Sequence, residues 1–293
     1  MSMVENGMLL VPGASLYYEV RGAGPVLLMI HGGGGDADKF LRVANHLANW
    51  YTVVTYDRRG HSRSSLVDRT EEYRLETHSD DAHRLLANLT DEPAYIFGSS
   101  SGACIGLDLS IMHPEQVRIL IPHEPVLLQL LFGNDQIQAR KSLEDLQENI
   151  HRELQDFQEN LCREGVFSAV MKLSSNLGID SSNQSNVEQM ERIVGNLTYF
   201  ITYEVPGIRS LSFDIDALKT VLKSSAMRVI PTGGSDSRGL FPFRCTVALA
   251  EQLGTEIVEF PSHHGGYNTI HHKVFAERLH DVLVNGSMYL KNR

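Results

Sequence analysis

Short apolar runs alternate with amphipathic segments along most of the chain. Runs rich in β-branched and aliphatic side chains, typical of buried strands, occur at residues 15–20, 26–30, 52–56, 94–97 and 117–121. Between them, apolar side chains three or four positions apart predict helices over about residues 37–49, 77–89 and 103–112. Gly22, Gly24 and Pro25 separate the first two runs and predict an antiparallel hairpin there. The repeated strand and helix pattern predicts an α/β fold, with a mostly parallel sheet and helices on both faces.

The pattern changes between residues 126 and 225. A long polar helix with one apolar stripe is predicted over residues 136–161, and further helices over about 165–177, 186–203 and 216–222, with a loop at 181–185. Strand patterns return at residues 227–232 and 256–260. We therefore predict a core formed by residues 1–125 and 226–293, with residues 126–225 inserted as a helical cap.

Composition limits the classes of partner. The 293 residues are 42% hydrophobic and 21% charged, which is ordinary for a globular chain of one domain with an insertion, or of two domains. The net charge of −10 repels phosphate backbones and anionic membranes, so neither nucleic acid nor a membrane is an expected partner. The first residues lack a cationic segment before an apolar one, so we expect a soluble, cytoplasmic protein. The three cysteines show no Cys-x-x-Cys spacing, which argues against disulfides and a zinc site.

The strongest local motif is Gly-Ser-Ser-Ser-Gly at residues 98–102. A strand pattern precedes it and a helix pattern follows it, as a nucleophile elbow requires, whereas a flexible Gly-Ser linker would need neither. The two glycines allow the sharp turn that lifts the central residue out of the sheet, so Ser100 is the candidate nucleophile. The start of the following helix would stabilise negative charge beside it.

A serine nucleophile needs a site for the oxyanion and a base. The His-Gly-Gly-Gly-Gly segment at residues 31–35 follows a strand, and backbone N–H groups there could bind an oxyanion, with Gly33 and Ser101 as the chosen donors. A phosphate cradle is the alternative use of such a loop, but the neighbouring residues fit no nucleotide-binding motif. His263 and His264 follow the last predicted strand, at the sheet edge where the elbow emerges, and are candidates for the base.

Taken together, these segments resemble the α/β-hydrolase family, including its cofactor-free haloperoxidase, esterase and lactonase members. The resemblance covers about residues 8–125 and 226–285, and includes the motifs at residues 31–33, 56–64, 98–102, 233–236 and 264–267. It implies the α/β-hydrolase fold, favours His264 over His263 as the base, and requires no cofactor or metal. It also implies that Asp57 belongs to the architecture beside the site.

The acid that orients the base has two candidates. Asp236 holds the position that the family usually uses, and it is the favoured assignment. Glu124 is the alternative, because residues 97–103 and 123–125 resemble the fungal zearalenone lactonase group, which takes its acid from a glutamate after the earlier strand. The chain order of serine, acid and histidine fits either.

We therefore expect a serine hydrolase that cleaves a carboxylic ester or lactone of a small-molecule substrate through an acyl-enzyme. A serine at the elbow argues against family members with a carboxylate nucleophile. Carbon–carbon bond hydrolysis with the same triad and a non-catalytic small-molecule receptor are the alternatives. The apolar stripe at residues 143–157 packs either inside the cap or against a second copy in a homodimer. Apolar residues of the cap either line a substrate pocket or pack between helices: Leu127, Leu128, Leu130, Leu131, Phe132, Tyr199, Phe200 and Tyr203.

Overall fold

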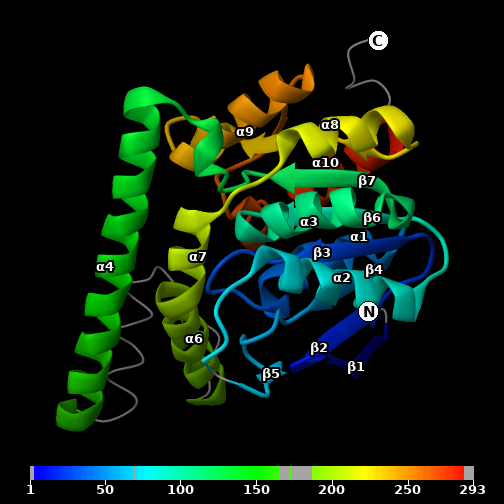
Figure 1. Ribbon diagram of the computed structural model, residues 1–293. Helices are drawn as coiled ribbons and strands as arrows, with labels where there is room; N and C mark the ends of the chain where they lie inside the picture. The colour runs from blue at the N-terminus through cyan, green and yellow to red at the C-terminus, as the bar shows by residue number, and fades with distance from the viewer. Residues whose placement is uncertain (1–2, 69, 165–171, 173–186, 287–293) are drawn as a thin grey trace.

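The computed structural model describes residues 3–68, 70–164, 172 and 187–286. Its centre is a ten-stranded sheet with the order β1-β2-β4-β3-β6-β7-β9-β10, in which β5 also pairs with β2 and β8 with β7 (Figure 1). Pairing is parallel from β4 to β10 and antiparallel where β2 meets β1, β4 and β5. The strands are β1 (Val4–Val11), β2 (Ala14–Arg21), β3 (Val26–Ile30), β4 (Thr52–Tyr56), β5 (Ser65–Leu66), β6 (Ala94–Ser99), β7 (Val117–His123), β8 (Arg228–Val229), β9 (Thr232–Gly234) and β10 (Val258–Phe260).

The predicted hairpin is wrong in its partners. The run at residues 26–30 forms β3, which lies between β4 and β6 and does not pair with β2 in the described sheet. The hairpin is instead β1–β2, closed by Pro12 and Gly13, whose φ of 77° suits a tight turn. Strand β1 escaped prediction because its sequence, VENGMLLV, places a polar pair and a glycine where a buried strand would be apolar.

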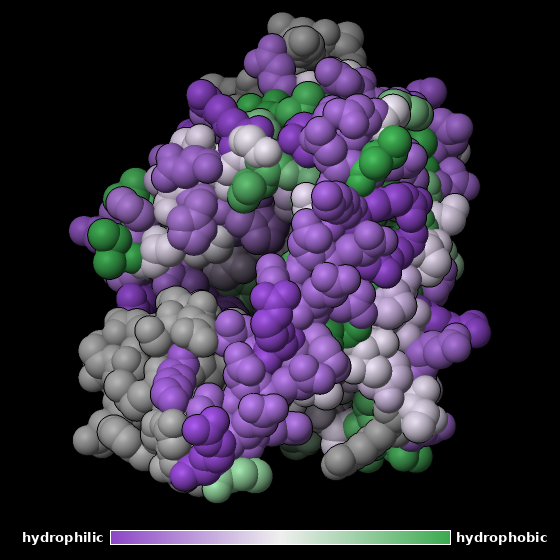
Figure 2. Space-filling view, turned by 90° about the vertical axis from the view of Figure 1, so that its left-hand side faces the viewer, coloured by the Kyte–Doolittle hydropathy of each residue, from purple (hydrophilic) through white to green (hydrophobic). Residues whose placement is uncertain are grey.

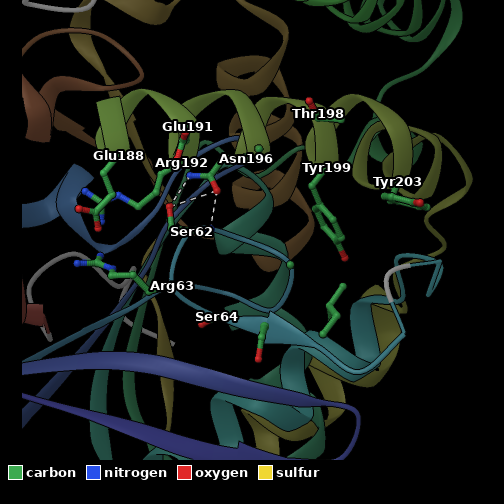
Figure 3. Close-up of a pocket in the computed structure, with 14 residues that line it drawn as sticks. Ser62, Arg63, Ser64, Glu188, Glu191, Arg192, Asn196, Thr198, Tyr199 and Tyr203 are labelled. Atoms are coloured by element: carbon green, nitrogen blue, oxygen red, sulfur yellow. Dashed lines mark hydrogen bonds between the residues drawn. The ribbon is translucent and has the colours of Figure 1, made fainter. Parts of the chain in front are cut away.

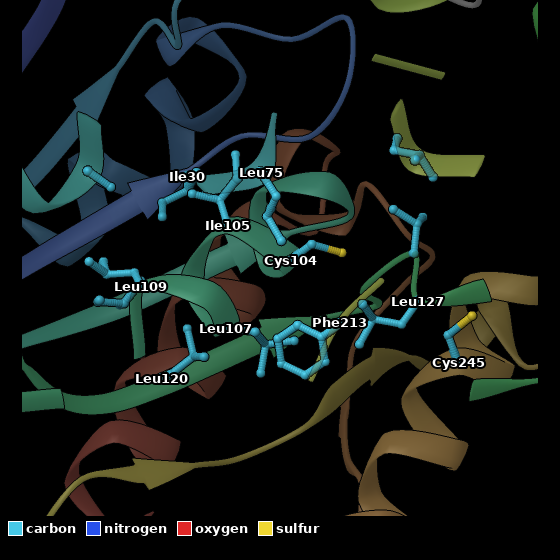
Figure 4. Close-up of a cluster of buried hydrophobic side chains, with 14 of the residues drawn as sticks. Ile30, Leu75, Cys104, Ile105, Leu107, Leu109, Leu120, Leu127, Phe213 and Cys245 are labelled. Carbon is cyan, nitrogen blue, oxygen red and sulfur yellow. The ribbon is translucent and has the colours of Figure 1, made fainter. Parts of the chain in front are cut away.

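Helices cover both faces of the sheet, as predicted. In the parallel strands, alternate side chains enter opposite cores: Leu28 and Ile30 of β3 pack in one cluster, and Leu27 and Met29 in the other. The first core receives helices α2, α3, α8 and α9, and Figure 4 shows part of it around Cys104 and Leu127. The second receives α1 and α10. The helices of the core are α1 (Leu41–Leu47), α2 (Leu75–Leu89), α3 (Ser101–Met112), α8 (Ile215–Ser224), α9 (Phe241–Leu253) and α10 (His272–Val284).

Short 3₁₀ turns complete the connections between these elements. They are η1 (Ala37–Phe40), η2 (Pro114–Gln116), η3 (Leu128–Leu130), η5 (Ser235–Ser237) and η6 (Gly266–Asn268). Turn η6 directly follows the loop after β10 that carries the candidate base. Turn η5, which precedes α9 in the chain, contacts the same loop where the Asp236 N–H donates to the Ser262 carbonyl at 3.1 Å.

The segment between η3 and α8, which we call the insert, is helical where it is described. It contains α4 (Gly133–Glu164), α6 (Val187–Tyr199), the π-helical turn η4 (Phe200–Glu204) and α7 (Val205–Ser210), standing beyond the ends to which the parallel strands point (Figure 1). The predicted helix at residues 165–177 and loop at 181–185 lie outside the described residues.

Helix α4 is amphipathic. It buries Ala139, Leu143, Ile150 and Leu154 along one stripe, and burial of each of the three larger side chains contributes about 1.5–3 kcal/mol. Its opposite face is hydrophilic, with a hollow in the molecular surface beside it (Figure 2). Despite its 32 residues, neither α4 nor any other described helix carries an apolar stretch that could cross a bilayer.

Candidate active site

The serine motif forms a sharp turn between β6 and α3. Ser100 has φ 57° and ψ −123°, a conformation that is strained for a residue with a side chain, and its N–H donates to the His123 carbonyl at 2.9 Å. A Cβ on Gly98 would lie 2.4 Å from the Gly102 carbonyl oxygen. A Cβ on Gly102 would lie 2.3 Å from that of Ile30. The elbow therefore requires glycine at both positions, and Ser100 stands between strand and helix with its side chain partly accessible.

The candidate base is held by a buried carboxylate. His264 Nδ1 lies 2.6 Å from Glu124 Oε2, and the other oxygen, Oε1, accepts the Gly234 N–H at 2.7 Å. The Glu124 side chain is fully buried, whereas that of His264 is 32% exposed. Burial alone would raise the pKa of Glu124, but the hydrogen bond from His264, the neighbouring His123 and the Gly234 N–H hold it below its ordinary value. Glu124 is therefore an ionised acceptor that leaves His264 Nε2 free to take a proton.

The favoured assignment of the acid does not fit this geometry, because Glu124 makes the contact expected of Asp236. The Asp236 side chain is exposed in η5, where its carboxylate accepts a hydrogen bond from Ser235 at 3.0 Å. Only its backbone N–H reaches the histidine loop, at the Ser262 carbonyl. The end of β9 holds Glu124 through its backbone, because the Gly234 N–H donates to Glu124 Oε1. Gly233 is required by a different neighbour, since its Cβ would lie 2.6 Å from the Phe243 ring.

The backbone of Glu124 is shaped for this position. Its φ is 50°, and its N–H donates to the Thr232 carbonyl at 3.0 Å, which turns the chain at the end of β7. His123, one residue earlier, lies among aromatic rings and shares a 3.1 Å hydrogen bond with the Thr232 hydroxyl. Burial lowers the pKa of His123 to about 4, so its ring is neutral near neutral pH.

The glycine loop lies against the elbow, as the oxyanion assignment requires. A Cβ on Gly32 would lie 2.9 Å from the Ser100 Cβ. Ser101 opens α3, so its N–H has no acceptor within the helix. The insert covers the loop, since a Cβ on Gly33 would strike the Phe200 ring at 2.1 Å. The candidate donors Gly33 and Ser101 are thus next to Ser100, under an aromatic side chain of η4.

A buried ion pair between insert and core escaped prediction. Glu204 of η4 accepts two hydrogen bonds from Arg58 Nη2, both at 3.0 Å, and both side chains are fully buried. Arg58 belongs to the loop after β4, in which Asp57 accepts hydrogen bonds from Ala37 and Arg63. No spacing in the sequence links residues 58 and 204. The one signal for this ion pair in the sequence was an acidic residue, Glu204, directly after the helix predicted at residues 186–203.

The insert also borders a cavity of about 580 Å³ between α6 and the segment leading to β5 (Figure 3). Tyr199 projects from α6 toward it, Tyr203 lines its edge, and Asn196 bonds to Ser62 at its upper side (Figure 3). Of the apolar residues predicted either to line a pocket or to pack, these two tyrosines line this cavity. Leucines 127, 128, 130 and 131 and Phe200 are buried in the core cluster, and Phe132 is exposed.

Comparison with known proteins places these features in a family. The profile of the alpha/beta hydrolase fold matches residues 25–162. An uncharacterized hydrolase, YraK of Bacillus subtilis (strain 168), is 60% identical over 280 residues, which cover 96% of each chain. The chain belongs to the α/β-hydrolase family. A zearalenone hydrolase of Cladophialophora bantiana is 34% identical over 130 residues, 41% of this chain and 47% of that protein.

Solved structures of the α/β-hydrolase family agree on the fold. E-2-(acetamidomethylene)succinate hydrolase superposes with a TM-score of 0.65 at 16% identity, over 96% of this chain and all of that one, 100%. The thioesterase domain from the curacin biosynthetic pathway superposes with a TM-score of 0.67 at 20% identity, over 95% and 99%. At these identities the likeness establishes the fold of this hydrolase and leaves its substrate to the site.

Proposed function

We propose that this α/β-hydrolase is a serine hydrolase that cleaves a carboxylic ester or lactone, with Ser100 as nucleophile, His264 as base and Glu124 as the orienting acid. The observation that carries the proposal is the 2.6 Å contact between the buried Glu124 carboxylate and His264, beside the strained serine elbow. The proposal assigns the role of the acid to Glu124 and not to Asp236. Glu124 is also the acid that the resemblance to the zearalenone lactonase group implies.

The reaction would proceed in two halves. His264 Nε2 takes the proton from Ser100 Oγ as that oxygen bonds to the carbonyl carbon, and the Gly33 and Ser101 N–H groups receive the resulting oxyanion. The C–O bond to the leaving group then breaks, and the leaving oxygen takes the proton from His264. In the second half, water gives a proton to His264 and attacks the acyl carbon, and Ser100 recovers its proton as the acid product leaves. Glu124 stays ionised and stabilises the imidazolium.

We further propose that the insert acts as the cap that selects the substrate. Phe200 lies on the glycine loop and belongs to the same buried apolar cluster as Leu127, Leu128 and Leu131, which favours an apolar acyl or lactone ring. The zearalenone hydrolase relative is named for hydrolysis of a lactone, and another relative, RutD of Azorhizobium caulinodans, is named for a carbamate; it is 36% identical over 109 residues. Both names describe acyl transfer to water, in line with the proposed chemistry.

The test is turnover by the purified protein. It would be assayed against p-nitrophenyl esters of graded acyl length, macrocyclic and small-ring lactones, and 1,3-diketones, with Ser100→Ala as the control. The proposal predicts ester or lactone hydrolysis that Ser100→Ala abolishes. Turnover confined to the diketones would replace it with carbon–carbon bond hydrolysis. Turnover that survives in Ser100→Ala would remove the nucleophile.

A further inference from the structure

The guanidinium of Arg58 joins the insert to the oxyanion loop. Its Nη2 donates to both carboxylate oxygens of Glu204 and also to the Gly32 carbonyl, at 3.1 Å. Glu204 stands on η4, the same turn that lays Phe200 on Gly33. One buried nitrogen therefore contacts a carboxylate of the insert and the peptide group that contains the candidate oxyanion donor, the Gly33 N–H.

The Gly32 carbonyl is held by several donors. Besides Arg58, it accepts the Gly35 N–H at 3.3 Å, and His31 Nδ1 lies 2.8 Å away. His31 Nε2 accepts the Arg58 backbone N–H at 3.1 Å, which favours the tautomer whose Nδ1 donates to Gly32 at 2.8 Å over acceptance of the longer contact from Arg58 Nε, at 3.4 Å. Burial and the Arg58 charge lower the pKa of His31 well below its ordinary value, which keeps this neutral tautomer.

The orientation of the Gly32 carbonyl determines the orientation of the candidate oxyanion donor, the Gly33 N–H. The Gly32 C=O and the Gly33 N–H belong to one planar trans peptide unit, in which the two bonds point in opposite directions. A carbonyl held toward Arg58 therefore aims the Gly33 N–H away from it. Donation to the carbonyl also polarises the peptide unit and strengthens its N–H as a donor. Because glycine has the widest backbone freedom, this loop would otherwise be the least constrained part of the site.

A contribution to folding stability does not by itself explain why the Arg58–Glu204 ion pair is buried. Burying two charges costs several kcal/mol per ion, and the attraction between them often no more than balances that cost. Burial alone would raise the pKa of Glu204, but Arg58 and His61 hold it far below its ordinary value, so both partners remain charged. Within the described residues, Arg58 Nη1 has no hydrogen-bond partner, so the guanidinium is not fully satisfied even in this pair.

We propose that Glu204 is a positioning residue of the insert: it holds Arg58 on the Gly32 carbonyl and so aligns the Gly33 N–H for the oxyanion. The inference rests on the proposed serine hydrolase function. In this arrangement the insert both selects the substrate and completes the catalytic geometry. The oxyanion hole is then fully formed only when η4 is docked on the core.

The test removes both charges together. The double variant Arg58→Met/Glu204→Leu keeps similar side-chain volumes and leaves no unpaired charge, so it should fold. Deleting an oxyanion donor costs about 10²–10³-fold in kcat, and a misaligned donor should cost less, about 10- to 100-fold, with KM changed by less than about threefold. Affinity for octyl trifluoromethyl ketone, whose adduct with Ser100 places an oxyanion in the hole, should fall by the same factor as kcat/KM.

A matched control is available on α6. Arg192 Nη2 pairs with Asp38 Oδ2 at 2.9 Å, which also links insert and core but does not touch Gly32. Arg192→Gln should keep kcat and trifluoromethyl ketone affinity within about twofold of wild type, because this partly exposed pair is open to solvent screening and does not touch the oxyanion loop. An equal loss in this variant would show that any loosening of the insert suffices and would overturn the specific role of Glu204.

The remaining outcomes are also decisive. Wild-type kcat and ketone affinity in a folded double variant would refute the positioning role. If the double variant does not fold, the isosteric Glu204→Gln is measured in the same way: a parallel fall in kcat and ketone affinity with unchanged KM supports the role, and unchanged values refute it. Failure of a fluorophosphonate to label Ser100 in the wild type would instead refute the proposed function itself.

Discussion

Glu124→Gln should nearly abolish activity through the tautomer of His264. Glu124 Oε1 accepts the Gly234 N–H at 2.7 Å, and Oε2 contacts His264 Nδ1 at 2.6 Å. Glutamine has one acceptor oxygen, which the buried Gly234 N–H requires, so its NH₂ group would face His264. The ring nitrogen Nδ1 must then accept, which moves the proton to Nε2. A histidine in that tautomer cannot take the proton from Ser100.

The size of this effect follows from the same argument. The equivalent acid-to-amide change in the serine protease triad lowers kcat by about 10⁴-fold, or about 5 kcal/mol of transition-state stabilisation. Asp236→Asn is the matched control: its exposed side chain contacts Ser235, so its kcat/KM should stay within about twofold of wild type, as for most surface changes.

The assay is the hydrolysis of a p-nitrophenyl ester by each variant, with thermal unfolding to confirm that each is folded. The predicted result is a collapse of kcat in Glu124→Gln alone. The reasoning is refuted if Glu124→Gln retains more than about a tenth of wild-type kcat, or if Asp236→Asn loses as much as Glu124→Gln.

Three further predictions concern neighbouring positions. Gly33→Ala should lower kcat by about 10²-fold, because the added Cβ would strike the Phe200 ring, and Phe200→Ala in the same chain should restore part of the loss in steady-state kinetics. Gly98→Ala should destabilise the protein by at least about 3 kcal/mol in urea unfolding, because its Cβ would lie 2.4 Å from a carbonyl oxygen; near-native stability would contradict the packing of the elbow. His123 has a pKa of about 4, so the unfolded chain binds the extra proton first as pH falls below the ordinary histidine value of about 6.5, and stability falls with pH in that window. His123→Gln should remove about 2 kcal/mol of the stability difference between about pH 7.5 and 5, and an unchanged difference would contradict this.

The fold was predictable where local pattern and burial agree. The buried runs that became β3, β4, β6 and β7 have apolar side chains on both faces, which is the pattern of a parallel sheet covered on both sides. The order of the strands in the sheet was harder to predict, because the sequence does not indicate which strands are neighbours. The turn at Gly22 and Gly24 was therefore interpreted as a hairpin, although the chain crosses to the far side of β4.

Part of the candidate site could likewise be predicted from the sequence. Ser100, the glycine loop and the late histidine follow strands that end at one sheet edge, so the sequence predicts that they lie close together. In the structure Gly32 lies against Ser100. The choice between Asp236 and Glu124 depends on which carboxylate reaches the His264 ring, and only the three-dimensional hydrogen bonding of Glu124 to Gly234 and His264 decides it. The ion pair between Arg58 and Glu204 could not be predicted from the sequence, because the two residues are 146 positions apart.

The most direct test of the account is the rate at which a fluorophosphonate phosphonylates Ser100, measured by intact-protein mass spectrometry and peptide mapping. The account predicts one adduct per chain, located on Ser100, absent in Ser100→Ala, and formed in Glu124→Gln at a rate slower by orders of magnitude. Labelling that persists in Ser100→Ala, or that proceeds at the wild-type rate in Glu124→Gln, would contradict the claim that Glu124 and His264 activate this serine.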